Sequence, residues 1–133
     1  MRNPDRSRRP LVLAAALLSA ALTLASCRPA PRRAEPGQAP LIGFSLDSLV
    51  VERWKRDAEI FTRSARELGA DVLLRVADQD HAVQERQIRD LADAGIHVLV
   101  VVPNDADRLS SVISEIRARG IRVLSYDRLV RHA

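Results

Sequence analysis

The chain has 133 residues with 21 basic and 17 acidic side chains, a formal net charge of +4 at pH 7. This length allows one domain, and a content of 47% hydrophobic and 29% charged residues excludes a wholly disordered chain. A single cysteine excludes an intrachain disulfide and a cysteine-rich zinc module.

The charge is unevenly distributed along the chain. Residues 1–40 hold seven arginines and two acids and carry +5, whereas residues 41–133 hold 14 bases and 15 acids and carry −1. The body of the chain therefore lacks the excess positive charge that binding to a phosphate backbone needs, and we expect no nucleic-acid partner.

The first 27 residues have the pattern of an export signal. Residues 1–10 contain four arginines, and residues 11–26 follow without a charge. A basic start before about 15 apolar residues is typical of a secretory signal peptide, and the run is shorter than the roughly 20 residues that span a bilayer.

The run ends in the letters LASC at Cys27, which resemble the lipobox of bacterial lipoproteins. The resemblance implies that Cys27 is lipidated and anchors an exported chain to a membrane of the cell envelope, on the periplasmic side. An ordinary cleaved signal with a chance cysteine, or an uncleaved anchor, remains an alternative.

Residues 28–40 are expected to form a linker. They contain four of the seven prolines in the chain. Proline fixes φ and removes a backbone donor, so the segment is predicted to be an extended spacer. At about 3.1 Å per residue, it would hold the body up to roughly 40 Å from the membrane.

From residue 41 onward, short apolar runs alternate with amphipathic stretches. The runs are rich in Val, Ile and Leu and nearly continuous, which is typical of strands buried on both faces of a parallel sheet. The four predicted strands cover residues 41–46, 71–77, 97–102 and 121–126.

The stretches between these runs have helical periodicity. In the first stretch, apolar residues recur every three or four positions and predict one buried stripe: Val51, Trp54, Ala58, Phe61, Ala65 and Leu68. The third shows the same spacing: Leu109, Val112, Ile113 and Ile116. The second is weaker and depends on Val83, Ile88, Leu91 and Ala92. Each helix is predicted to end at a glycine, namely Gly69, Gly95 and Gly120. The order β-α-β-α-β-α-β predicts an α/β fold, a three-layer parallel sheet with right-handed crossovers.

In an open parallel sheet, ligands bind beyond the carboxyl ends of the strands. The residues that follow the four predicted strands are polar and rich in carboxylates: 47–49, 78–81, 103–105 and 127–128. Some of these side chains are adequately explained as helix caps, among them Asp80 and either Asn104 or Asp105.

Several kinds of chemistry are unsupported. The sequence contains no GxGxxG or GxxxxGK[ST] phosphate-binding motif and no GxSxG nucleophile motif. The histidines His81, His97 and His132 have no metal-ligand spacing. We therefore expect no metal, no cofactor and no enzymatic activity.

Two residue pairs at strand ends suit a neutral polyol. Arg53-Trp54 follows the first strand, and Asp127-Arg128 follows the fourth. Arginine supplies donors and aspartate supplies acceptors, while an aromatic ring can cover the C–H face of a sugar. From the residues alone, other interpretations remain open: Trp54 as core, Arg53 as a solvated side chain, and Asp127-Arg128 as a local ion pair.

The segments SLDSLVVERWKRDAEIF, VVVPNDAD and VLSYDR resemble the ribose/galactose-type (type I) solute-binding family of bacterial ABC sugar importers, over about residues 41–129. The ERW letters at 52–54 resemble the corresponding segment of the members that bind D-xylose. The resemblance implies that Arg53 and Trp54 hydrogen-bond to and stack on a monosaccharide, and that Asp127 and Arg128 hold its hydroxyls. Asp47 matches an acid in the same segment. An ABC permease and an ATPase would be the protein partners.

Members of this family have two similar lobes with the sugar between them. By that resemblance, residues 41–133 are a truncated part of the first lobe. The alternative is a sugar-sensing regulatory domain or a receiver-like signalling domain on a similar sheet. Such regulators begin with a helix-turn-helix, and a receiver needs an acidic pair after the first strand, where this chain has Asp47 alone.

Overall fold

The computed structural model describes residue 35 and residues 37–131. Its elements, in chain order, are β1 (Leu41–Leu46), α2 (Glu52–Glu67), β2 (Asp71–Val76), α3 (His81–Asp93), β3 (Val98–Val101), α4 (Ser110–Ala118) and β4 (Arg122–Ser125). The predicted alternation of strands and helices is confirmed. The predicted signal peptide, Cys27 and most of the predicted linker lie outside the described residues. Among the residues described, no helix is long and apolar enough to cross a bilayer.

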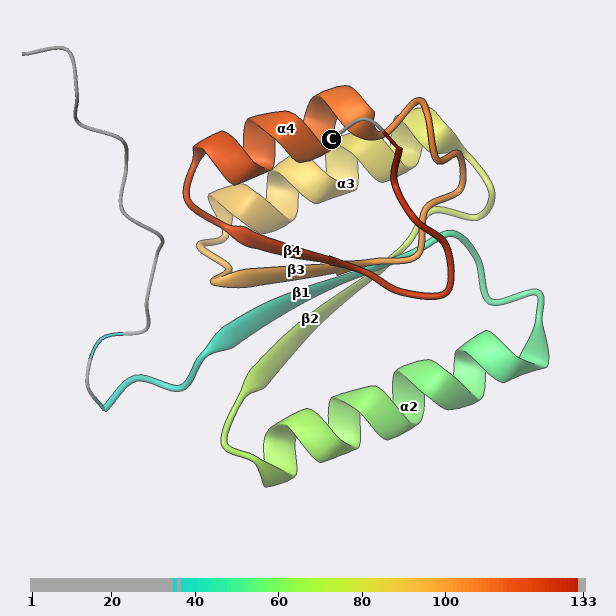
Figure 1. The fold of residues 1–133 in the computed structure, drawn as a ribbon. Helices are drawn as coiled ribbons and strands as arrows, with labels where there is room; N and C mark the ends of the chain where they lie inside the picture. The colour runs from blue at the N-terminus through green and yellow to red at the C-terminus, as the bar shows by residue number, and fades with distance from the viewer. Residues whose placement is uncertain (1–34, 36, 132–133) are drawn as a thin grey trace, which may run out of the picture.

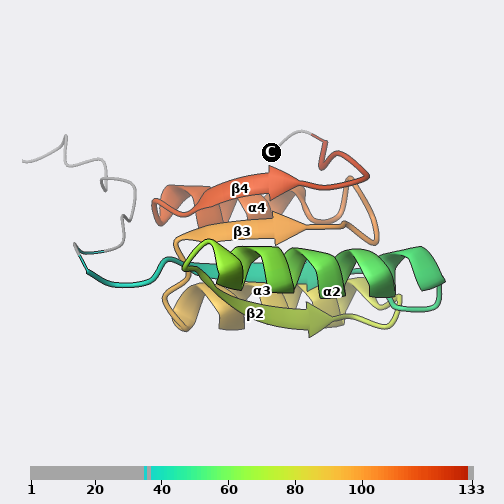
Figure 2. The same cartoon turned by 90° about the horizontal axis from the view of Figure 1, so that it is seen from below.

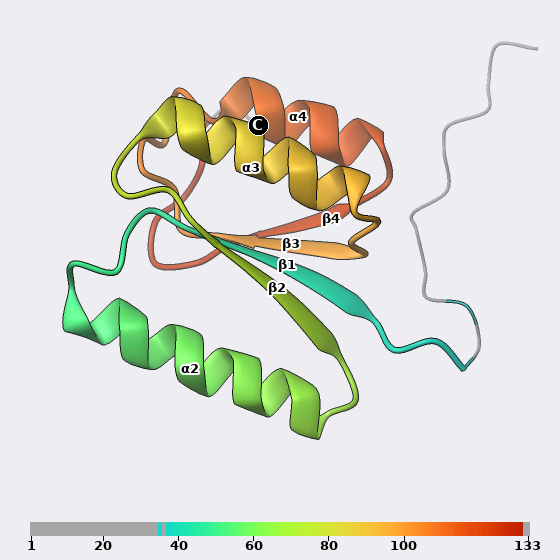
Figure 3. The same ribbon diagram turned by 180° about the vertical axis from the view of Figure 1, so that it is seen from behind.

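The four strands form one parallel sheet in the order β2-β1-β3-β4. Helix α2 lies against one face, and α3 and α4 lie side by side against the other (Figures 1 and 3). The predicted three-layer α/β architecture is therefore confirmed. Because β1 is central, the chain enters the sheet in the middle and adds strands on both sides. This order places the carboxyl end of β1 between those of β2 and β3.

The core is split by the sheet into two clusters. Successive strand residues point to opposite faces, and β3 shows this directly. Leu99 and Val101 pack with the apolar faces of α3 and α4, whereas Val100 and Val102 pack with residues under α2, such as Phe44. The three β3 residues named here and Val102, which directly follows the strand, are all buried. The apolar run of β3 is nearly continuous because the strand is buried on both faces.

The two edge strands differ from the prediction of two-sided burial. β2 and β4 are only partly buried along their length. Leu124 of β4 is 57% exposed, because α2 packs along β2 and does not reach β4 (Figure 2). The face of β4 that points away from α4 is therefore open to solvent.

The helix stripes are confirmed in their central parts. Every apolar residue predicted for the third helix is buried, and Trp54, Ala58 and Ala65 are buried in α2. Val51 and Leu68 were predicted in the same stripe, but both are exposed. They are the N-cap and C-cap residues of α2, so they lie beyond the part of the helix that faces the sheet. The three predicted terminating glycines all have positive φ, between 80° and 86°.

Candidate functional site at the strand ends

Five side chains meet at the carboxyl end of the sheet: Asp47, Arg53, Trp54, Asp127 and Arg128. We call them the strand-end cluster. Asp47 directly follows β1, Arg53 and Trp54 are in the first turn of α2, and Asp127 and Arg128 follow β4. All five were predicted as ligand-binding residues, and contacts link each of them to another member.

An ion pair between Arg53 and Asp127 joins α2 to β4. Nη2 of Arg53 donates to Oδ1 of Asp127 at 2.5 Å, across 74 positions of sequence. The hydrogen bond to this carboxylate, and its charge, raise the pKa of Arg53. The Arg53 side chain is nevertheless 60% exposed. The pair therefore brings two segments together but leaves the guanidinium open to a ligand.

The backbone at Asp127 is strained in a way that directs its side chain. Asp127 has a φ of 64°, and the N–H of Arg128 donates to the carbonyl of Tyr126 at 2.7 Å. This three-residue γ-turn is rare for a residue other than glycine. It reverses the chain directly after β4, where the carboxylate of Asp127 contacts both arginines. Strain of this kind is often found at binding sites.

Arg128 is the centre of the cluster. Its guanidinium carbon lies 5.0 Å from the centroid of the Trp54 ring. Its nitrogens lie 3.7 Å from Oδ2 of Asp127 and 3.6 Å from Oδ2 of Asp47. Nη1 also donates to the carbonyl of Pro103 at 3.2 Å. The cation is thus placed over an aromatic face between two carboxylates, with its side chain still 42% exposed.

Trp54 belongs both to the core and to the cluster. It is only 5% exposed and packs with Phe44, Leu46 and Ala58, as the core interpretation of its stripe position predicted. Its Nε1 is buried and has no hydrogen-bond partner among the described residues. Because Arg128 covers one face of the ring, direct stacking of a sugar on that face requires Arg128 to move. In the arrangement described, Trp54 supports the arginine.

Sequence reasoning missed two neighbours of the cluster. Nδ2 of Asn104 donates to Oδ1 of Asp47 at 2.6 Å, and the Tyr126 hydroxyl donates to Oδ2 of Asp57 at 2.9 Å. That hydrogen bond, with desolvation, raises the pKa of Tyr126. Asn104 was considered only as a helix cap. Its position after the third predicted strand placed it at the same edge of the sheet as Asp47, but the sequence does not show that β1 and β3 are neighbours.

The helix-cap interpretation is correct for Asp80 but wrong for Asp105, because the N-cap of α4 is Leu109, which has no side-chain cap hydrogen bond. Asp80 is the N-cap of α3, and its Oδ1 accepts from the N–H groups of Ala82 and Val83. Oδ1 of Asp105 accepts from the N–H groups of Asp107 and Arg108 in the loop before α4. These hydrogen bonds lower the pKa of both carboxyl groups. Among the described residues, no group of histidine, cysteine and acidic side chains has the arrangement of a metal site.

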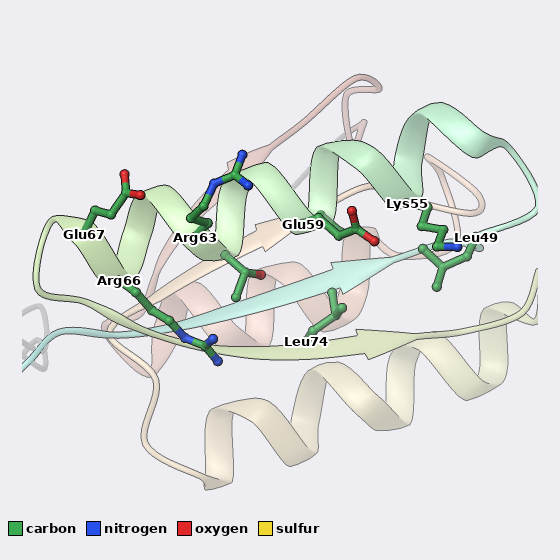
Figure 4. A pocket seen from close by; sticks show the side chains of 9 residues that line it. Leu49, Lys55, Glu59, Arg63, Arg66, Glu67 and Leu74 are labelled. Atoms are coloured by element: carbon green, nitrogen blue, oxygen red, sulfur yellow. The ribbon is translucent and has the colours of Figure 1, made fainter.

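Two surface hollows flank α2, and neither is lined by a member of the strand-end cluster. The larger, of about 570 Å³, lies between α2 and β2 and has an apolar floor that includes Leu74 (Figure 4). Charged residues of α2, such as Lys55, Glu59 and Arg63, stand along its rim (Figure 4). The smaller, of about 380 Å³, lies on the other flank of α2 and is lined by Phe44, Leu124 and Tyr126.

The strand-end cluster is chemically suited to an uncharged ligand that is rich in hydroxyl groups. Its two arginines and two aspartates balance in charge. The arginines offer donors and the aspartates offer acceptors within one small region. A phosphate or carboxylate would meet Asp47 and Asp127 as like charges, whereas a polyol hydroxyl can donate to an aspartate and accept from an arginine.

Residues 42–133 match the model of a family described as "Periplasmic binding protein domain". The chain belongs to this family. Apart from Leu41, the first residue of β1, the match covers every strand and helix described above and the whole strand-end cluster, so the family resemblance inferred from the sequence is confirmed. The first residue of the match, Ile42, lies in β1.

Two curated relatives are D-xylose-binding periplasmic proteins. The one from Haemophilus influenzae is 44% identical and the one from Escherichia coli is 39% identical, each over 92 residues, which is 69% of this chain. The match covers 28% of each of these relatives. The chain therefore corresponds to less than a third of their length.

Solved structures show the same architecture. An ABC transporter solute-binding protein from Clostridium phytofermentans with bound β-D-glucose superposes with a TM-score of 0.66 at 29% identity, covering 68% of this chain and 28% of that one. A carbohydrate transporter solute-binding protein from Chloroflexus aurantiacus in complex with D-glucose gives 0.67 at 28% identity, covering 72% and 28%. The fold is that of the type I periplasmic binding proteins, and this chain contains part of it.

Proposed function

We propose that this chain is a sugar-binding component of an ABC importer and that the strand-end cluster forms one wall of the sugar site. The observation that supports it most is the convergence of Arg53, Asp127 and Arg128 from α2 and β4 at one edge of the sheet. The sugar is proposed to be D-xylose or a related monosaccharide, because the relatives with 44% and 39% identity are named for D-xylose.

The cluster would bind a sugar by exchanging its internal pairs for hydroxyl contacts. Arg53 and Asp127 are joined by one hydrogen bond, which leaves other donors on the guanidinium and lone pairs on the carboxylate unused. Adjacent hydroxyls of a sugar can contact both groups at once. Asp47 is almost fully buried, so it would act on the sugar chiefly through Arg128.

The proposed setting is the cell envelope. Export by the N-terminal signal and lipidation of Cys27 would hold the chain at a membrane on the periplasmic side, near a permease and its ATPase. No observation favours the regulatory alternative. For a receiver-like domain, the end of β3 should carry an aspartate, but it reads Val101-Val102-Pro103, and Asp47 is engaged by Asn104 and Arg128.

Titration of the isotope-labelled full chain with D-xylose tests the sugar site. We expect NMR shifts at Arg53 and Arg128 that saturate with D-xylose and are lost in Asp127→Asn, which keeps the side-chain shape and removes the charge. Asp93→Asn is the matched control, since it breaks a comparable exposed pair, with Arg119 at 2.7 Å, at the C-terminus of α3. Equal titration of the parent and Asp127→Asn would contradict the proposal.

Labelling of cells with a radioactive fatty acid tests the anchor separately. We expect the parent chain to incorporate the label and to sediment with membranes, and Cys27→Ala to do neither. Label retained by Cys27→Ala would show that the cysteine is not the site of lipidation.

A further inference from the structure

A buried glutamine connects the core of the fold to the strand-end cluster. Gln84 lies in α3 and is fully buried. Its Nε2 donates to Oγ of Ser45 at 3.2 Å and to the carbonyl of Val102 at 2.9 Å. Its Oε1 accepts from the backbone N–H of Asn104 at 2.8 Å. Since a buried amide without partners is costly, these contacts fix the orientation of Gln84.

Asn104 is consequently held at two points. Its backbone N–H is bound by Gln84, and its side-chain amide donates to Oδ1 of Asp47 at 2.6 Å. The first contact sets the position of the loop after β3. The second transmits that position to a carboxylate that follows β1. Neither contact involves the helix cap role that the sequence suggested for Asn104.

Asp47 passes the constraint to Arg128. The Asp47 side chain is only 7% exposed, and its two oxygens have separate partners. Oδ1 is occupied by Asn104, and Oδ2 lies 3.6 Å from Nη1 of Arg128. With Oδ1 fixed, the carboxylate cannot turn away from the arginine without losing a charge-assisted hydrogen bond.

We propose that Gln84 and Asn104 are positioning residues that hold Arg128, through Asp47, over Trp54 in the orientation that receives the sugar. The inference rests on the proposed sugar-binding function for its purpose, but the mechanical part concerns only this chain. Preorganisation of a cation in this way lowers the conformational cost of binding.

Trp54 provides a direct readout, because it is the only tryptophan in the chain. In the full chain, we expect Asn104→Ala to shift the Trp54 fluorescence and raise its quenching by acrylamide toward the values of Arg128→Ala, in which the covering cation is absent. NMR of the Arg128 guanidinium should show faster motion in Asn104→Ala than in the parent. Unchanged Trp54 quenching and unchanged Arg128 dynamics in Asn104→Ala would overturn the proposal.

A matched pair of glutamines separates positioning from stability. Gln87 is in the same helix, and its Nε2 also donates to a carbonyl at the end of a strand, that of Val76, at 2.9 Å. We expect Gln84→Met to alter Trp54 quenching and Gln87→Met to leave it at the parent value. Equal effects of the two substitutions would reduce Gln84 to a structural residue. If Gln84→Met does not fold, Asn104→Ala decides alone.

Sugar titration distinguishes this inference from the proposed function. We expect Asn104→Ala to weaken D-xylose binding about tenfold, the size expected when one charge-assisted hydrogen bond is lost. If the parent does not bind D-xylose but Asn104→Ala still frees Arg128, the sugar function is wrong and the positioning role stands. If both bind D-xylose equally while Arg128 stays fixed, the positioning role is wrong and the sugar function stands.

Discussion

Gly43 lies in the middle of β1, where its lack of a side chain is required for space rather than for an unusual backbone. A Cβ at this position would lie 2.7 Å from Cδ1 of Ile96 and 3.3 Å from Cδ1 of Leu91. Both neighbours are fully buried, so neither can move aside freely. We expect Gly43→Ala to lower the free energy of unfolding by about 1–3 kcal/mol through overpacking, measured by urea denaturation.

A double mutant tests that cause. Ile96→Val removes the methyl group nearest to the added Cβ, and by itself should cost about 0.5–1.5 kcal/mol. Combined with Gly43→Ala it should cost less than the sum of the two single changes, because the two residues are in contact. Strict additivity would show that the clash with Ile96 is not the source of the loss.

The carboxylate of Asp80 makes part of the stability dependent on pH. Its two hydrogen bonds from the start of α3 lower its pKa in the folded state. The contribution is therefore complete above the ordinary pKa of an aspartate and is lost as pH falls through the lowered folded value. Asparagine caps helices equally well without titrating. We expect the drop in Tm between pH 7 and pH 3 to be smaller in Asp80→Asn than in the parent.

Asp105 provides the comparison for this measurement. Its pKa is lowered by the same kind of contact, in the loop before α4. Asp105→Asn should reduce the acid sensitivity in the same direction, and the two substitutions should add, since they act on different segments. An acid-induced drop in Tm that is identical in all variants would assign the pH dependence to other carboxylates.

At the level of residues, the sequence predicted which side chains would meet at the strand ends but not which contacts they would make there. The rule that parallel strands end at one edge was enough to group Arg53 with Asp127, although 74 positions separate them. The bond from Asn104 to Asp47 could not be predicted, because it depends on the order of β1 and β3 in the sheet. Sequence periodicity carries no information about which strands are neighbours.

At the level of elements, the length over which a helix touches the sheet decides which of its apolar residues contribute to the free energy of unfolding. Leu68 and Ile116 occupy equivalent stripe positions in the sequence, but Leu68 is 87% exposed and Ile116 is fully buried. We expect Ile116→Ala to lower the free energy of unfolding by about 2–5 kcal/mol. Leu68→Ala should change it by less than about 0.5 kcal/mol.

Chemical denaturation of both variants under the same conditions checks this difference. The paired design removes the effect of composition, since each variant replaces a four-carbon aliphatic side chain with alanine in a helical region. A loss of comparable size in Leu68→Ala would mean that this residue is covered in solution by something outside the described contacts.

The edge strands show the same limit of sequence reasoning. The apolar runs of β1 and β3 predicted their two-sided burial correctly, but the run that became β4 also suggested it. Leu124 is exposed because burial of an outer strand depends on whether a helix reaches that far across the sheet. A run of valine and leucine shows that a strand can be buried, whereas its place in the sheet decides whether it is.

At the level of the whole molecule, the helices cover the sheet unequally. α3 and α4 together cover one face, whereas α2 covers only part of the other (Figures 1 and 2). Exposed apolar residues border the smaller of the two hollows beside α2, namely Ile60, Leu124 and Tyr126. The strand-end cluster adjoins this same region, since Tyr126 is followed directly by Asp127. In the part of the chain that the structure describes, the strand-end cluster therefore lies beside an open surface.

This openness sets the expected strength of sugar binding by the 133-residue chain itself. Arg53 and Arg128 have side chains 60% and 42% exposed, so a bound sugar would remain partly in water and replace hydration with protein contacts of similar strength. A hydrogen bond made under such conditions nets only about 1 kcal/mol. Three or four of them give about −4 kcal/mol, a dissociation constant of about 1 mM for D-xylose.

Isothermal titration calorimetry and NMR on the full chain, each carried to sugar concentrations well above that value, measure this constant. Micromolar binding by a monomer would contradict the expectation, because it would require the sugar to be far more enclosed than the exposed arginines of the strand-end cluster allow.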